Sequence, residues 1–396
     1  MTSTTRTDAT QSAPPPGEKT NVKLLDLQAQ YLPIRNEIRR AIDEVCDAQA
    51  LILGPHVERF ERAMAAYCGV EHAIGVASGT DALLLSLAAL GVGPGTSVVT
   101  SAFTFFATGS TIARLGATIV FADVDPVTLN LDPRSVEAAI ARAPGRVAGI
   151  VAVHLYGRLA DMDALAAIAQ RHGCWLLEDA AQAIGARRGG RAAGTFGRAG
   201  CFSFYPTKNL GALGDAGMIV TGDGDLAARL RRDRHQGQID RYHHESLGFC
   251  ARLDAVQAAV LRAKLPYLDR WTARRRALAR SYGDALRGAG VAGARNAPVV
   301  LPPDAGDDHV WHQYVVRARR RDALLGHLTA AGIGAMVYYP VPLHRQPPLA
   351  PVSATPVPLD ETERAANDVL ALPIYPELSD EQQAAVVTAV RAFYSV

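Results

Sequence analysis

The length, composition and charge of this chain exclude several classes of protein. With 396 residues, of which 48% are hydrophobic and 20% are charged, the chain can form two or three domains with a large buried core. Its formal net charge of +2 lacks the basic excess of a general nucleic-acid-binding protein. We therefore expect no nucleic-acid partner, and we interpret the arginine runs 274–276 and 319–321 as solvated surface.

The cysteines and the N-terminal composition point to a reducing compartment. Five cysteines are scattered without a CxxC pair, so the sequence predicts neither a metal site nor a disulfide framework. Residues 1–21 lack the apolar core of a signal peptide, and we expect a disordered N-terminal tail. The strongest apolar stretch, 82–92, contains Ser86 and is too short to cross a bilayer. The sequence therefore predicts a cytoplasmic protein with no membrane partner.

Strand and helix patterns alternate through the first half of the chain. An amphipathic helix is expected within 22–50, where Ile34, Ile38 and Val45 recur at helical spacing. Helices are also expected at 80–90 and 162–171. Short β-branched runs predict strands at 72–77, 97–101, 118–122, 149–153, 175–178, 201–205 and 218–221. This alternation favours an α/β domain with a mostly parallel sheet.

The second half is helical at first and then rich in proline. A long helix is expected over 253–286, with an interruption at Pro266. A strand at 310–316 and helices at 321–331 and 380–394 follow. We therefore predict a large domain with an N-terminal helix over 22–265. A linker helix and a small C-terminal domain are expected over 266–396.

One lysine stands in a polar loop directly after a short apolar strand, in the segment FSFYPTKNLG (202–211). From such a strand end Lys208 can project into a pocket. Desolvation or a cationic neighbour would lower its pKa and leave a nucleophilic neutral amine. The alternative is an ordinary surface lysine, and this segment alone favours that alternative.

A second apolar strand ends in acidic residues, in the segment CWLLEDAAQ (174–182). Carboxylates at the carboxyl end of a strand point to where α/β folds bind ligands. Asp179 could keep the pyridine nitrogen of pyridoxal 5′-phosphate (PLP) protonated, which makes the ring an electron sink. It could equally cap the following helix.

Two further segments suit a phosphate and an aromatic ring. SGTDAL (78–83) joins a strand to a helix, where free N–H groups suit a phosphate, although ordinary helix capping is the alternative. FTFF (103–106) follows a strand and could stack on a cofactor ring, although a phenylalanine is more often core. The glycines of GVGPG (91–95) lack dinucleotide-motif spacing, so we predict a turn there.

Together and in this order, the segments resemble the DegT/DnrJ/EryC1/StrS family of PLP-dependent sugar aminotransferases. The resemblance runs from Leu24 to the C-terminus and includes HLYG (154–157) and YPVPLH (339–344). It implies an α/β fold of the aspartate-aminotransferase type (fold type I), with a large, mostly parallel-sheet domain and a smaller C-terminal α/β domain. It also implies a homodimer with shared active sites, an amino-acid donor and a keto-sugar acceptor.

The resemblance assigns the chemistry to three residues. Lys208 corresponds to the lysine that forms a Schiff base with PLP and shuttles protons. Asp179 corresponds to the partner of the pyridine nitrogen, and Gln182 to the residue beside the ring hydroxyl. Relatives that carry out dehydration have a histidine at the lysine position, so Lys208 favours transamination.

The resemblance also implies which residues surround the cofactor and the substrate. Phe105 corresponds to the stacking aromatic residue. The phosphate cradle corresponds to Gly79, Thr80 and Ser203. The residues expected near the substrate pocket are His154, Tyr339 and Arg252.

Three positions depart from the family pattern. Cys250 stands where the asparagine of an Asn-x-Arg segment is usual, and a thiol cannot donate amide hydrogen bonds. Upstream, RHQG (234–237) differs from the common His-Gly pair, and Ala216 replaces a glycine. Because the family presents the Asn-x-Arg segment to the PLP phosphate of the partner subunit, we expect weaker cofactor retention.

The sequence thus predicts transfer of an amino group, from glutamate by resemblance, to a nucleotide-linked 3-keto or 4-keto hexose. Antibiotic or surface-polysaccharide biosynthesis would fit this activity. A keto-cyclitol acceptor is one alternative. A non-catalytic PLP-binding regulator is the other; Cys250 motivates it, and Lys208 and Asp179 argue against it.

Overall fold

The computed structural model describes residues 21–293 and 296–395, so nearly all of the tail expected at 1–21 lies outside the described residues. Within these ranges the helices are α1 (Leu27–Ala48), α2 (Pro55–Cys68), α3 (Gly79–Ala89), α4 (Phe106–Arg114), α5 (Pro133–Ala141), α6 (Met162–Arg171), α7 (Gly224–Asp233), α8 (Ala255–Lys264), α9 (Leu268–Gly288), α10 (Arg321–Ala330), α11 (Asp360–Asp368) and α12 (Asp380–Tyr394). The strands are β1 (His72–Val76), β2 (Ser97–Ser101), β3 (Thr118–Ala122), β4 (Val147–Val153), β5 (Trp175–Asp179), β6 (Arg187–Arg188), β7 (Arg191–Ala192), β8 (Ala199–Ser203), β9 (Gly217–Thr221), β10 (Gln238–Asp240), β11 (His243–His244), β12 (Val299–Val300), β13 (Tyr314–Ala318), β14 (Ser353–Ala354) and β15 (Val369–Leu372).

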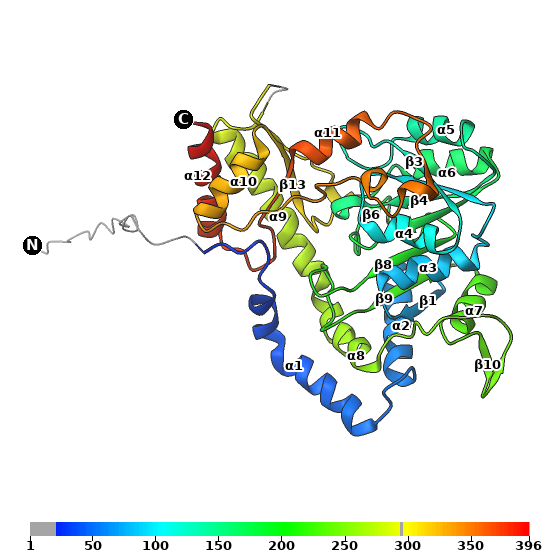
Figure 1. Cartoon of the computed structure of the whole chain (residues 1–396). Helices are drawn as coiled ribbons and strands as arrows, with labels where there is room; N and C mark the ends of the chain where they lie inside the picture. Colours follow the sequence, from blue (N-terminus) through cyan, green and yellow to red (C-terminus); the bar gives the residue numbers. More distant parts are fainter. Residues whose placement is uncertain (1–20, 294–295, 396) are drawn as a thin grey trace, which may run out of the picture.

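A large, mostly parallel sheet organises the first part of the chain (Figure 1). In the described residues its strand order is β1-β9-β8-β5-β4-β2-β3-β14. Strand β9 runs antiparallel to both of its neighbours, and the other pairs are parallel. Because β1 and β8 are both antiparallel to β9, they share one direction, so the carboxyl ends of β1, β8, β5, β4 and β2 meet at one edge. The predicted parallel α/β architecture is confirmed.

Two expected strands differ most from those observed. The strand expected at 310–316 begins only at Tyr314, because the backbone of Trp311 has a φ of 50° and Val310 N donates to Gly157 O at 2.9 Å. The strand expected at 201–205 ends at Ser203, where Tyr205 N turns back to Ser203 Oγ at 3.3 Å. Pro266 lies in a 3-10 turn between α8 and α9, as predicted.

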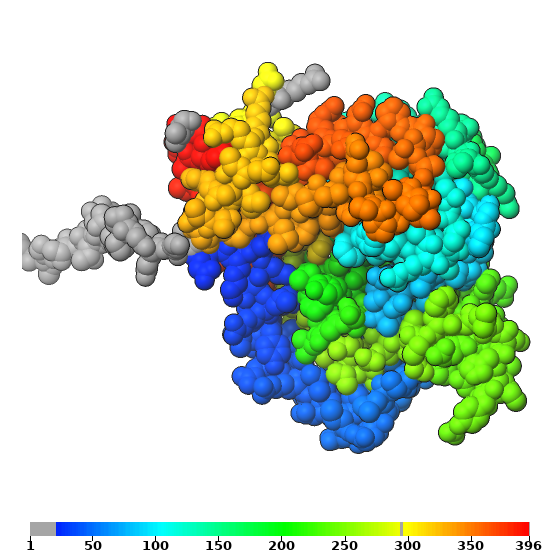
Figure 2. All heavy atoms as spheres, in the orientation of Figure 1, coloured from blue at the N-terminus to red at the C-terminus, as the bar shows by residue number. Residues whose placement is uncertain are grey.

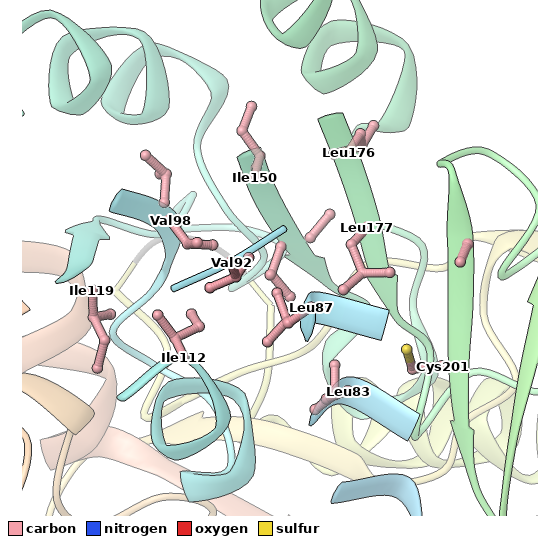
Figure 3. Packing of buried hydrophobic residues seen from close by; sticks show 14 of the residues in the cluster. Leu83, Leu87, Val92, Val98, Ile112, Ile119, Ile150, Leu176, Leu177 and Cys201 are labelled. Atoms are coloured by element: carbon pink, nitrogen blue, oxygen red, sulfur yellow. The ribbon is translucent and has the colours of Figure 1, made fainter. Parts of the chain in front are cut away.

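Helix α3 is buried on almost every side, which explains its strongly apolar sequence. Leu83 and Leu87 pack in the same core as Ile150 and Leu177 of the sheet (Figure 3). The buried Ser86 accepts a hydrogen bond from Cys201 Sγ at 3.4 Å. None of the helices in the described part of the chain is long and apolar enough to cross a membrane.

A second hydrophobic core lies around the antiparallel sheet β12-β13-β15, with α9, α10 and α12 beside it. Two segments connect this region with the large sheet. Val22, near the N-terminus, packs in this second core and pairs with Ile333. The segment around Leu343 and Leu349 packs instead in the large core, and its strand β14 extends the large sheet beside β3. In Figure 2 this orange segment lies over cyan residues of the large domain. The domain boundaries expected from the sequence stay a prediction.

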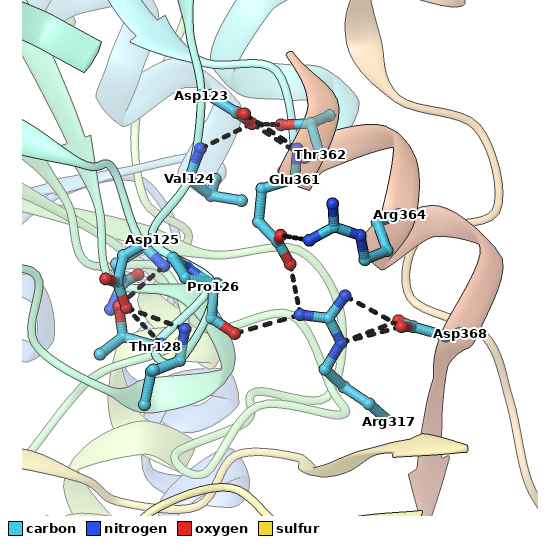
Figure 4. Close-up of polar contacts among 12 residues, drawn as sticks. Asp123, Val124, Asp125, Pro126, Thr128, Arg317, Glu361, Thr362, Arg364 and Asp368 are labelled. Carbon is cyan, nitrogen blue, oxygen red and sulfur yellow. Dashed lines mark hydrogen bonds and ion pairs between the residues drawn. The ribbon is translucent and has the colours of Figure 1, made fainter. Parts of the chain in front are cut away.

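The first turn of α11 is fixed to the end of β3 by one carboxylate. Asp123 accepts hydrogen bonds from Glu361 N at 2.9 Å, from Thr362 N at 2.8 Å and from Thr362 Oγ1 at 2.7 Å (Figure 4). The N–H groups of a first helical turn have no acceptor inside the helix. Asp123 therefore satisfies these donors and fixes α11 against the large sheet.

Arg317 on β13 joins the same cluster from the smaller sheet. Its guanidinium pairs with Asp368 at 2.9 Å and with Glu361, and it donates to Pro126 O at 3.1 Å (Figure 4). The Arg317 side chain is 17% exposed and that of Glu361 is 9% exposed. One guanidinium thus neutralises two carboxylates of α11 and contacts the loop after β3.

Replacing Arg317 with methionine should lower the free energy of unfolding by about 3 kcal/mol, because two largely buried carboxylates would lose their shared cation. The matched control is Arg364→Met. Arg364 also pairs with Glu361, but its side chain is 62% exposed, so its loss should cost about 1 kcal/mol or less. Urea unfolding of both variants measures the difference, and equal losses would contradict this account.

Candidate active site

The carboxyl edge of the sheet brings the predicted site residues together. Asp179 and Ser203 are the last residues of β5 and β8. His154 directly follows β4, and the loop before α3 follows β1. The parallel register of β4 and β5, in which Val153 pairs with Asp179, brings their ends level with each other. Ligands of open α/β sheets bind at this edge.

Asp179 is a buried carboxylate with specific hydrogen-bond donors. It is 5% exposed; Oδ2 accepts from Thr108 Oγ1 at 2.8 Å and Oδ1 accepts from Ala181 N at 3.3 Å. Burial raises the pKa of Asp179, whereas the Thr108 hydroxyl, the Ala181 N–H and the charge of Lys208 lower it. A cation beside Asp179, such as a protonated pyridine nitrogen, would favour its ionised form.

Lys208 lies partly buried in a tight loop after β8. The loop is closed by Lys208 N donating to Tyr205 O at 2.8 Å and by Ala212 N donating to Phe204 O at 2.8 Å. Withdrawal from water lowers the pKa of Lys208 to about 8, and the opposing effect of Asp179 is smaller. At pH 7 roughly a tenth of the side chain is then a neutral amine, far more than for an ordinary lysine with a pKa of about 10.4, and the neutral amine is the form that attacks an aldehyde.

Gln182, Tyr339 and Phe105 lie together beside Asp179. Gln182 Oε1 accepts from Tyr156 N at 2.6 Å, and Gln182 Nε2 donates to Tyr339 Oη at 3.1 Å. The rings of Phe105 and Tyr339 have centroids 6.2 Å apart. Phe105 is 56% exposed, so much of its ring remains available to contact a planar ligand. Phe105 and Gln182 thus both contact Tyr339, and the cofactor and substrate roles expected for these residues stay predictions.

The loop before α3 has the geometry of an anion site. Ser78 caps the helix by accepting from Asp81 N at 3.0 Å. In the described part of the chain the N–H groups of Gly79 and Thr80 have no acceptor. A Cβ on Gly79 would lie 2.6 Å from the Cβ of Ser203, so only glycine allows these loops to approach so closely. Two free N–H groups at a helix N-terminus and the Ser203 hydroxyl fit a phosphate.

His154 is placed among the site residues, but both of its ring nitrogens are already used inside the protein. Nδ1 accepts from Ala160 N at 3.2 Å, so the hydrogen lies on Nε2, which donates to Glu178 Oε2 at 2.8 Å. His154 and Glu178 are both fully buried. This geometry supports a structural role that joins β4 to β5, and the substrate contact expected for His154 stays a prediction.

Arg252 and Cys250 lie on the segment that follows the β10–β11 hairpin. Arg252 Nη2 donates to Cys250 Sγ at 3.1 Å, and Arg252 Nη1 lies 3.0 Å from His235 Nδ1. Arg252 also forms a backbone bridge to Val76 at the end of β1. Cys250 is exposed, and its thiol accepts where the usual asparagine would offer an amide donor.

The sequence analysis missed two residues that orient the site. Thr108 in α4 donates to Asp179, and its position two residues beyond Phe106 gave no indication of a partner on β5. Asn209, next to Lys208, is buried; its Nδ2 donates to Val310 O at 3.1 Å and its Oδ1 lies 3.3 Å from His312 Nδ1. In the sequence, the only signal for Asn209 was its position directly after Lys208.

Comparisons with known proteins agree with this geometry. The sequence profile of the DegT/DnrJ/EryC1/StrS aminotransferase family matches residues 33–391. The chain is 49% identical to a Geobacillus stearothermophilus protein named pleiotropic regulatory protein, over 94% of this chain and 99% of that protein. It is 43% identical to the UDP-N-acetyl-3-dehydro-α-D-glucosamine 3-aminotransferase of Acidithiobacillus ferrooxidans, over 94% of this chain and 98% of that protein. The crystal structure of Streptomyces venezuelae DesV in complex with a ketimine intermediate superposes with a TM-score of 0.89 at 45% identity, covering 95% of this chain and 99% of DesV.

The rate at which the protein captures PLP should rise with pH and level off above about pH 8, because the neutral amine of Lys208 attacks and its pKa is lowered to about 8. Free Nα-acetyl-lysine, with a side-chain pKa of about 10.4, is the control and should continue to rise beyond that pH. Stopped-flow absorbance records both profiles. A protein profile that follows free lysine would contradict the lowered pKa.

Replacing Thr108 with valine should raise the dissociation constant of PLP about tenfold, because a hydrogen bond to a buried carboxylate is lost. Thr111→Val is the matched control. Thr111 is buried in the same helix, but its hydroxyl donates to Ala107 O at 2.9 Å and not to Asp179. Absorbance titration with PLP measures both constants. If both variants weaken binding equally, Thr108 does not act through Asp179.

Proposed function

Because this chain belongs to the DegT/DnrJ/EryC1/StrS aminotransferase family, we propose that it moves the amino group of L-glutamate to the keto group of a nucleotide-linked hexose. The observation that carries the proposal is that Lys208, whose pKa is lowered to about 8, and the buried carboxylate of Asp179 lie at or after neighbouring strand ends, where their charges act on each other through space. A neutral amine beside a buried acid is what capture and activation of PLP require.

Each site residue then has a defined task. Bound PLP supplies an aldehyde and an electron-accepting ring. Asp179 would keep the ring nitrogen protonated, and the N–H groups of Gly79 and Thr80 would hold the phosphate. The free Nζ of Lys208 would be the base that takes the proton from the α-carbon of the amino donor. Phe105 limits the movement of the ring.

The acceptor is proposed to be a 3-keto hexose linked to a nucleotide. The Acidithiobacillus relative is named for amination at position 3 of a UDP-linked sugar, and this chain aligns with 98% of that protein. A keto-cyclitol acceptor would use the same site residues and stays open.

We also propose that the active sites are shared in a homodimer. Around the Lys208 loop, Phe105, Tyr205 and Leu213 are 56%, 52% and 50% exposed, and a second subunit would remove this apolar surface from water. Such a subunit would bring its own Cys250 and Arg252 to the cofactor phosphate. The weaker cofactor retention expected from Cys250 stays a prediction within this proposal.

A non-catalytic regulator is the second candidate. The Geobacillus relative at 49% identity is named a regulatory protein, which favours this candidate. However, a protein that only bound PLP would not need a lysine of lowered pKa next to a buried acid. Retention of Lys208 and Asp179 therefore supports turnover.

A single-turnover experiment tests the proposed function. Mixing the PLP-loaded protein with L-glutamate should produce pyridoxamine phosphate, and addition of a UDP-linked or dTDP-linked 3-keto hexose should restore PLP. The Lys208→Ala variant should lose turnover by several orders of magnitude, because it lacks the α-proton base.

Each outcome of this experiment separates the candidates. If pyridoxamine phosphate forms but only a keto-cyclitol converts it back to PLP, the acceptor is a keto-cyclitol and not a sugar. Failure of the wild-type protein to form pyridoxamine phosphate with any amino acid would favour the regulator. Full activity of Lys208→Ala would contradict the role of the lysine.

A further inference from the structure

A cavity of about 250 Å³ lies directly beside the Lys208 loop. Thr207, the residue before Lys208, forms part of its wall. The polar side chains around it are those of Arg275, His312, Gln313 and Tyr338, and the remaining wall is apolar, from the N-terminal segment and β15. An apolar cavity with a few convergent polar groups is typical of a small-molecule site.

Arg275 is a buried cation at this cavity, so the expectation of a solvated surface for the run 274–276 is wrong at this position. It is 2% exposed, and Nη1 donates to Ile374 O at 2.9 Å and to Trp311 O at 3.1 Å. Nη1 also lies 3.4 Å from His312 O, whereas Nε has no hydrogen-bond partner among the described residues. Burial lowers the pKa of Arg275 to about 10, so it remains charged at neutral pH. A buried charge that carbonyl groups satisfy only in part favours an incoming anion.

The nearest acidic influence does not neutralise Arg275. Glu377 acts on it through space, but Glu377 Oε2 is itself buried without a hydrogen-bond partner in the described part of the chain. The two groups therefore do not form a close pair. Glu377 would instead repel an anion that binds at Arg275.

Two neighbouring groups are suited to the opposite end of a zwitterion. Asn209 Nδ2 donates to Val310 O, so Asn209 Oδ1 faces His312 and accepts the hydrogen of Nδ1. His312 Nε2 then carries a lone pair, and burial together with the charges of Lys208 and Arg275 holds the pKa of His312 well below its usual range. Gln313 Oε1 is likewise buried without a donor among the described residues. Both atoms can accept from an ammonium group.

We propose that this cavity binds the α-carboxylate of the amino donor, with Arg275 as its cation and with His312 and Gln313 as acceptors for the donor's ammonium. This inference rests on the proposed function. The α-carboxylate is the group concerned because it is attached to the carbon that must reach Lys208, and the cavity adjoins Thr207. The acceptor sugar carries no such carboxylate at its reacting carbon, so it would not use Arg275.

The test compares L-glutamate with 4-aminobutyrate, which keeps the amine and the distal carboxylate but lacks the α-carboxylate. The ratio of their rate constants for pyridoxamine phosphate formation is measured in PLP-loaded wild type and Arg275→Gln. Loss of a buried cation opposite a carboxylate should lower this ratio about 30-fold. The second half-reaction, with a keto-sugar, should be unchanged.

Arg276→Gln is the matched control for this test. Arg276 lies on the same helix and donates to His309 O at 3.0 Å, but it does not line the cavity. Its ratio should equal that of the wild type. An unchanged ratio in Arg275→Gln, or an equal fall in Arg276→Gln, would overturn the inference. Failure of the wild-type protein with both amines would instead overturn the proposed function.

A second variant keeps the inference testable if Arg275→Gln does not fold. Glu377→Gln removes the negative charge that competes for Arg275, so the dissociation constant of α-methyl-L-glutamate, measured by spectral titration of the PLP-loaded protein, should fall about threefold or more. This ligand cannot lose an α-proton, so the measurement reports binding and exchange of its amine with Lys208, without the later proton transfer. An unchanged or higher constant would overturn the inference.

Discussion

The buried carboxylate of Asp179, within electrostatic reach of a lysine withdrawn from water, is the constraint on which the rest of the site depends. Burial alone would protonate Asp179 and would leave Lys208 as an ordinary neutral amine. The Thr108 hydroxyl and the Ala181 N–H offset this cost at the carboxylate. The site therefore suits a ligand with a cationic group, which would contact Asp179, and an electrophilic group, which would react with Lys208.

The fold delivers this pair through the direction of its strands. β5 contributes Asp179 and β8 leads into the Lys208 loop, and both strands run the same way, so their ends coincide. The loop before α3, with the free N–H groups of Gly79 and Thr80, comes from β1, which shares their direction because β9 is antiparallel to both β1 and β8. The smaller sheet reaches the same edge through Tyr339 and through the segment that carries His312. The cluster around Arg317 and Asp123 holds that sheet against the large domain.

Local sequence patterns predicted most of the strands and placed Asp179, Phe105 and Gly79 after strand ends, whereas Gln182 was assigned by the family resemblance alone. Contacts that depend on register between distant strands could not be predicted. The bond between His154 and Glu178 requires β4 and β5 to align, and strand β14 is only two residues long in a proline-rich stretch. The strand expected at 310–316 was wrong because its first residues bend to contact the large domain. Side-chain pairing across 71 residues, as between Thr108 and Asp179, leaves no local pattern.

One measurement tests the central claim most directly. The chain has only four lysines, Lys19, Lys23, Lys208 and Lys264, and burial lowers the pKa of both Lys208 and Lys264 to about 8. Borohydride reduction of the PLP-loaded protein, followed by peptide mass mapping, identifies the lysine that binds the cofactor. If the position of the lysine relative to Asp179 determines where PLP binds, the label lies on Lys208 alone. A label on Lys264, or no reducible adduct at all, would contradict the account.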